Sequence, residues 1–215
     1  MSLLDLITGS TGNQVAEQAE NKFGISKSQI IALLIVAAPL VISYLKKKSE
    51  NADEAEKLNA ALDKDHDGSI LNDPSQALNR GQEGDSILGH IFGGEKANVE
   101  NQLSQNTGIS MDKIGPIMAM LAPVIMGYIG QQKQANNVTS GGGLGDLLGG
   151  ILGGSAQEAQ ASNNPLSDIL GSVLGGASQS SGGLGDILGG VLGGGGQQQS
   201  QQGGLGGLLG GLFGK

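Results

Sequence analysis

The chain has 215 residues, a formal net charge of −8, no cysteine, no tryptophan, two tyrosines and three phenylalanines. A negative chain with so few aromatic side chains is poorly suited to tracking phosphates or stacking on bases, so we expect no nucleic acid partner. The lack of cysteine excludes disulfides, thiolate metal sites and thiol nucleophiles.

The N-terminal sequence MSLLDLITGS has no basic n-region and carries Asp5 within its first apolar stretch. A secretory signal has neither property, so we expect a cytoplasmic protein. Glycine divides the rest of the chain, because 27 of the 40 glycines lie in residues 137–215. Glycine disfavours helices. We therefore expect the folded domain at residues 1–136 and a disordered, Gly/Leu/Gln-rich tail at residues 137–215.

A repeat organises the predicted domain. Residues 2–49 align without a gap onto residues 86–133, and 13 of the 48 positions are identical. We interpret this as a tandem duplication. Each copy predicts a short apolar helix, an amphipathic helix that ends at a glycine, and a long apolar helix. The predicted helices cover residues 3–7, 13–23 and 30–45, and then 87–92, 97–107 and 114–130. The fold class is therefore all-α, with an internally duplicated helical domain.

The two long helices are apolar on nearly all sides, which is typical of helices buried in protein or in lipid. Their apolar runs of 16 and 17 residues would span only about 24–26 Å, less than the roughly 30 Å of a hydrocarbon core. The lengths favour a pair of central core helices. Insertion of both helices into a membrane is the alternative.

A further helix is predicted at residues 52–62, followed by an aspartate-rich loop at residues 63–74 that joins the two copies. The loop reads DKDHDGSILNDP and resembles the first eight positions of an EF-hand calcium loop, with Gly68 at the sharp turn. The expected calcium ligands are Asp63, Asp65, Asp67, Ser69 and Asp73. Pro74 occupies the position of the closing acid, so the acids could equally be solvated in a capping loop. His66 is expected to point outward, away from the ligands.

The tail repeats one short pattern four times. We call these segments the first to fourth Gly-Leu motifs, and they are residues 144–152, 166–174, 184–192 and 205–213. Each has apolar residues on one helical stripe and resembles the predicted short helix of the domain. A nine-residue segment with so much glycine is too short to be helical alone, so we expect each motif to become helical on binding. The expected interaction residues are Leu147, Leu148, Ile151, Leu152, Ile169, Leu170, Ile187, Leu188, Leu208 and Leu209.

The aspartate loop, the string GDSILGHIFGG at residues 84–94 and the apolar segment at residues 109–130 together resemble the bacterial YidB-like family of small α-helical proteins. The resemblance covers roughly residues 2–133. It implies a bacterial origin and an all-α fold. It implies no activity, because the function of that family is unknown.

The sequence contains no recognisable nucleophile, phosphate-loop or zinc motif, so we expect neither an enzyme nor a small-molecule substrate. Calcium is the only cofactor that a motif suggests. The hypothesis that best explains the four motifs is a self-associating or scaffolding protein, in which a motif docks into the groove that receives residues 3–7 or 87–92, on the same or another copy. The alternatives are a membrane-associated protein that uses its two apolar helices, and a calcium-responsive binding module.

Overall fold

The computed structural model describes residues 1–161, and within that range the regular structure consists only of helices. The first three helices are α1 (Leu3–Thr8), α2 (Ser10–Phe23) and α3 (Lys27–Lys48). The helices α4 (Ala52–Asp65), α5 (Gly81–Phe92), α6 (Lys96–Thr107) and α7 (Met111–Ala135) follow, and α8 (Leu144–Ala161) is the last. Short 3-10 turns lie at Ser69–Leu71, Pro74–Asn79, Gly93–Glu95 and Gly141–Gly143. The predicted all-α class is confirmed.

Local capping signals set several helix ends where the sequence predicts them. Gly24 and Gly108 end α2 and α6 with φ angles of 64° and 69°, in the left-handed region that favours glycine. The Ser26 hydroxyl accepts a hydrogen bond from the Gln29 amide at 3.4 Å and donates one to Gln29 Oε1 at 2.9 Å. Ser26 therefore caps α3, although the Gln29 side chain returns to the hydroxyl and not to the backbone. Ser2 and Asp5 form a complete capping box on α1.

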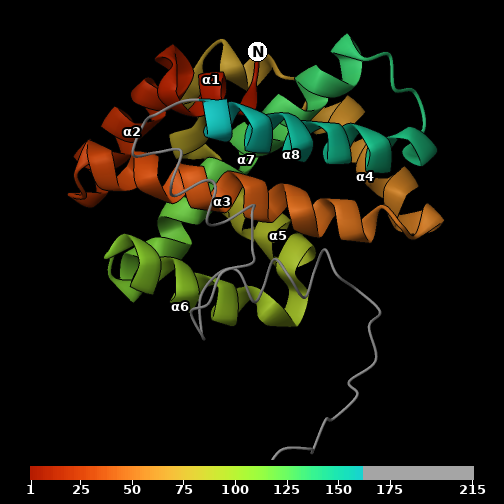
Figure 1. The fold of residues 1–215 in the computed structure, drawn as a ribbon. Helices are drawn as coiled ribbons and strands as arrows, with labels where there is room; N and C mark the ends of the chain where they lie inside the picture. Colours follow the sequence, from red (N-terminus) through yellow and green to blue (C-terminus); the bar gives the residue numbers. More distant parts are fainter. Residues whose placement is uncertain (162–215) are drawn as a thin grey trace, which may run out of the picture.

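The two long helices α3 and α7 form the centre of the core. Both are long and apolar enough to cross a membrane, but 72% of the most apolar window of α3 and 83% of that of α7 are buried inside the fold. The helix α7 packs mainly against α5, and α3 packs mainly against α2 and α8. Figure 1 shows α8 lying along α3, with α5 and α6 on the other side of α3.

Candidate interaction groove beside helix α8

The first Gly-Leu motif is the beginning of α8 and packs on the domain. Leu144, Leu148 and Leu152 are 0%, 0% and 7% exposed, respectively. They are spaced four residues apart, so they share one face of the helix. This face packs against α3 mainly, and α8 also contacts α1 and α7. We call the surface that receives these three leucines the α8 seat.

The burial of the leucines explains why a glycine-rich segment is helical. Five glycines between Leu144 and Gly154 would cost about 4–5 kcal/mol of helix propensity relative to alanine. Three buried leucines contribute about 5–9 kcal/mol by removing apolar surface from water. The motif is thus held as a helix by its contacts with the domain. The sequence predicts that the folded domain ends at residue 136. The first Gly-Leu motif lies beyond that boundary, yet it packs on the domain.

The start of α8 is anchored against α4. The Gly141 amide donates a hydrogen bond to Glu56 Oε2 at 3.0 Å. A Cβ atom at Gly141 would lie 2.7 Å from both the Ala55 carbonyl carbon and the Glu56 amide nitrogen, so only glycine fits there. The equivalent residues before the other three motifs are Asn163, Ser181 and Gln202. The first motif is therefore the only one of the four whose preceding residues match this anchor.

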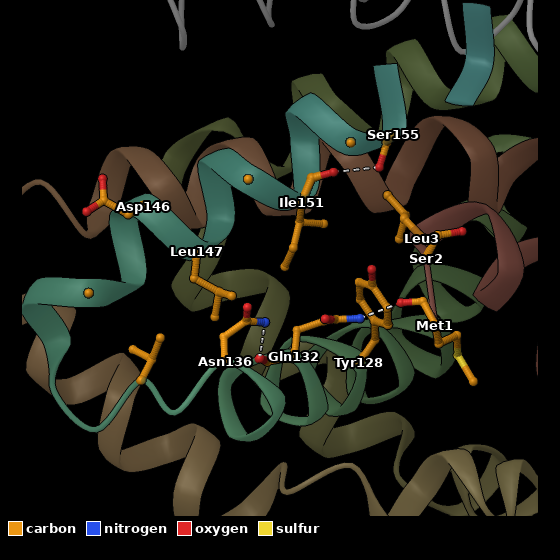
Figure 2. A pocket seen from close by; sticks show the side chains of 14 residues that line it. Met1, Ser2, Leu3, Tyr128, Gln132, Asn136, Asp146, Leu147, Ile151 and Ser155 are labelled. Carbon is orange, nitrogen blue, oxygen red and sulfur yellow. Dashed lines mark hydrogen bonds between the residues drawn. The ribbon is translucent and has the colours of Figure 1, made fainter. Parts of the chain in front are cut away.

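A groove of about 660 Å³ runs along the side of α8 that carries Leu147 and Ile151. We call it the α8 groove. Figure 2 shows that the start of the chain, the end of α7 and the length of α8 form its walls. Its apolar side chains include Leu3, Leu147 and Ile151. Both Leu147 and Ile151 are only partly buried, so two of the four expected interaction residues of the first motif face this groove and not the α8 seat.

The polar groups of the α8 groove mostly bond to the fold itself. Gln132 Nε2 donates to the Met1 carbonyl at 2.5 Å, Asn136 Nδ2 donates to the Gln132 carbonyl at 2.8 Å, and Ser155 Oγ donates to the Ile151 carbonyl at 2.7 Å. Asp146 is the one charged side chain among the described residues that line it. A long, partly apolar groove with one charged side chain is suited to docking a helix.

The other expected interaction residues are Ile169, Leu170, Ile187, Leu188, Leu208 and Leu209, and they lie outside the described residues.

The aspartate loop has a different geometry from the one expected of a calcium site. Asp63 and Asp65 lie in the last turn of α4, which continues past the predicted end at residue 62. Gly68 does form the expected sharp turn, with a φ angle of 95°. Within residues 1–161, no three acidic or histidine side chains are grouped closely enough to hold a metal ion. The structure therefore does not bring the five expected ligands together, and calcium binding stays a prediction.

Three of the expected ligands have structural contacts instead. Asp63 pairs with Lys133, a lysine that is only 3% exposed. Asp67 Oδ1 accepts a hydrogen bond from the Ser69 amide at 2.9 Å, and this bond lowers the pKa of the carboxyl. Asp73 caps the Pro74–Asn79 turn, and hydrogen bonds from Ser75 and Gln76 lower its pKa. Asp67 and Asp73 thus stabilise the loop as capping residues.

The expectation that His66 points outward is wrong, since its exposed fraction is 5%. His66 directly follows α4, and its carbonyl oxygen would lie 1.7 Å from a Cβ at Gly130. The missing side chain of Gly130 therefore lets the loop lie directly on α7. Burial lowers the pKa of His66 and outweighs the opposing effect of the Glu83 carboxylate. No hydrogen-bond partner of His66 Nδ1 lies within the described part of the chain.

A second cavity, of about 260 Å³, lies between α4 and α5 beside His66. Its other lining residues are Leu45, Lys48, Glu54, Lys57, Leu58, Ala61, Ser86, Ile87, His90, Ile91 and Met126. Glu54 accepts a hydrogen bond from Lys57 at 2.9 Å and lies 3.4 Å from His90 Nε2. The Glu54 carboxylate at the cavity thus already has partners within the fold.

Replacement of Asp63 by alanine should destabilise the protein by about 1–3 kcal/mol, because it leaves the buried Lys133 ammonium without its partner. The loss should be the same in chelator and in millimolar calcium, as measured by urea unfolding. Asp63→Ala combined with Lys133→Met should recover most of the loss. A stabilising effect of calcium on the parent chain that Asp63→Ala removes would instead support the calcium site.

Comparison with known sequences agrees with the resemblance noted above. The family described as "Bacterial protein of unknown function (DUF937)" matches residues 5–132, which run from α1 into the last turns of α7. The match ends before α8 and the α8 groove is built partly from residues beyond it. No curated protein and no solved structure matched the chain. The YidB-like resemblance is thereby confirmed, and the chain belongs to this bacterial family of unknown function.

Proposed function

We propose that this protein is a non-enzymatic, self-associating scaffold in which Gly-Leu motifs of one copy occupy the α8 seat of another. The observation that carries the proposal is the docked first motif, which identifies a surface on this chain that fits a Gly-Leu helix. Exchange of an identical element between copies is a low-cost route to assembly. Here each chain has one seat and four motifs.

The other motifs keep the residues that the seat requires. The three buried positions of the first motif correspond to Leu, Leu and Leu in the second and third motifs and to Leu, Leu and Phe in the fourth. The glycine that faces the Lys46 side chain, Gly149, is also glycine in all four. Each motif can therefore make the same apolar contacts as α8 in a vacant seat.

The connection between α7 and α8 makes exchange depend on concentration. Only eight residues, 136–143, separate the two helices, so the first motif is held near its own seat at an effective concentration in the millimolar range. A motif from another copy competes successfully only where copies are concentrated, and the three further motifs of each chain raise the chance of engagement. This predicts reversible association that grows with protein concentration.

Insertion of α3 and α7 into a membrane is the competing proposal. It would require these helices to exchange their contacts with each other and with α2, α5 and α8 for contacts with lipid. Burial of 72% and 83% of their most apolar windows within the fold favours the core role.

Light scattering at rising protein concentration tests the scaffold proposal. The average mass of the full chain should grow more steeply than that of a truncation after Ala161 or of a variant with aspartate at the six expected interaction residues of the second to fourth motifs, because both variants keep only the first motif for exchange. The first motif stays intact in both variants, so the fold is unperturbed. The matched control places six aspartates in the linkers, at Ser178, Ser180, Gln197, Gln198, Gln199 and Ser200.

The linker control has the same added charge and should associate like the parent. Equal masses for all four proteins at every concentration would contradict the proposal, because the motifs would then contribute nothing to assembly. Loss of association in the linker control as well would show that the effect of the aspartates is one of charge alone.

A further inference from the structure

We propose that the second Gly-Leu motif, residues 166–174, folds back antiparallel to α8 and occupies the α8 groove of its own chain. The proposal is independent of self-association, because its contacts lie within one chain and use the groove and not the seat. The segment proposed to occupy the groove, residues 166–174, lies outside the described residues.

The length of the groove matches the length of the motif. The residues of α8 that line the groove extend from Asp146 to Ser155, which is about 14 Å along the axis of a helix. A helix over the nine residues of the second motif is also about 14 Å long. One motif therefore fills the groove from end to end.

The four residues that join α8 to the second motif, 162–165, are few enough to keep the motif close to the groove and enough to let the chain reverse direction. Ala161 lies six residues past Ser155, or about 9 Å along the helix, and packed helices are separated by about 8–10 Å. The start of the motif must therefore lie about 13 Å from Ala161. Residues 162–165 bridge this gap, since five extended peptide steps reach about 17 Å.

The third and fourth motifs are joined to α8 by 22 and 43 residues, respectively. Such long connections reduce their effective concentration at the groove relative to that of the second motif.

Charge supports the antiparallel direction. Asp146 lies at the end of the groove where α8 begins, far from Ser155 (Figure 2). An antiparallel second motif places Asp168 near the Ser155 end, about 10 Å along the helix from Asp146. A parallel motif would place the two carboxylates side by side, which is unfavourable.

The walls of the groove suit the apolar stripe of the motif. Leu147 and Ile151 present apolar surface that is only partly covered in the fold, and Leu3 lines the groove but is 2% exposed. Gly150 and Gly154 lie between them on α8, and a Cβ at either would meet nothing within 4 Å. The missing side chains leave room for a second helix to approach the backbone of α8 closely.

Disulfide trapping tests the inference on the full chain, which has no natural cysteine. In antiparallel register Leu170, which lies on the apolar stripe of the motif, is opposite Ile151 and next to Gly150. Gly150→Cys with Leu170→Cys should therefore form an intrachain disulfide under mild oxidation at about 1 µM protein. The control is Gly153→Cys with Leu170→Cys. Gly153 is equally open but does not line the groove. We expect the groove pair to close at least tenfold faster, as measured by non-reducing gels and peptide mass spectrometry.

Equal rates for the two pairs would overturn the inference, since they would indicate a tethered but undocked segment. A disulfide between two chains would also overturn it and would place another copy in the groove. Neither result depends on whether the α8 seat exchanges motifs, so the inference and the scaffold proposal fail separately.

Discussion

Gly84→Ala is expected to destabilise the full chain by about 3 kcal/mol in urea unfolding. Gly84 lies where α5 crosses α7, and a Cβ at this position would lie 1.6 Å from the carbonyl oxygen of Ala119 and 2.5 Å from its carbonyl carbon. Both atoms belong to the backbone of a central helix, so neither can rotate away. The two helices would have to separate, and overpacking of this kind typically costs 1–3 kcal/mol or somewhat more.

Gly89→Ala is the matched control, because Gly89 lies in the same helix and a Cβ there meets nothing within 4 Å. Alanine is the better helix former, so this variant should be more stable than the parent by about 0.5–1 kcal/mol. The two substitutions add the same atoms to the same helix and differ only in what those atoms contact. If Gly84→Ala is no less stable than Gly89→Ala, the close approach of α5 to α7 is wrong.

The helices with strong local signals could be predicted from the sequence. Gly24 and Gly108 end helices because glycine enters the left-handed region without strain, and Ser26 starts one because its hydroxyl accepts an amide hydrogen bond. Residues 2–49 and residues 86–133 each include a long apolar helix, although α5 has 12 residues and α1 only six. These features depend on neighbouring residues and so leave a pattern.

Tertiary contacts decided the features that the sequence could not predict. Residues 81–86 extend α5 well before its predicted start, where Gly84 packs on α7. Residues 63–65 extend α4 into the predicted calcium loop, and Asp63 pairs with Lys133, 70 positions away. The burial of His66 likewise depends on Gly130 in α7. Each case requires two residues that are distant in the sequence, and a local motif contains no information about the second one.

The α8 groove could not be predicted from the sequence either, because its walls come from distant parts of the chain. Its walls come from the first residues of the chain, the end of α7 and the first Gly-Leu motif. The apolar stripe of the motif predicted that Leu147, Leu148, Ile151 and Leu152 act together. In the structure they divide between two surfaces, since Leu148 and Leu152 are buried in the seat and Leu147 and Ile151 line the groove. The helical period alone does not tell which side of a wide stripe faces the domain.

Leu148→Ala is expected to weaken the docking of α8 by about 3 kcal/mol, because Leu148 is 0% exposed and its truncation leaves a cavity against the domain. The expected loss of docking free energy is comparable with the net free energy that holds the glycine-rich helix α8 in its seat. Hydrogen exchange of the α8 amides measures the effect directly. A loss of about 3 kcal/mol in local stability should accelerate exchange by about 100-fold, while amides of α3 and α7 should change much less.

Leu147→Ala is the matched control, since it makes the same substitution in the adjacent, partly buried position that faces the groove. It should cost about 1 kcal/mol or less, because it removes less buried surface. The contrast between the two variants tests which side of α8 packs on the domain. If both accelerate exchange equally, the seat is not built from the Leu144, Leu148 and Leu152 face. If neither does, α8 is not held by the domain, the folded part ends near residue 136, and a Gly-Leu motif has no seat to exchange.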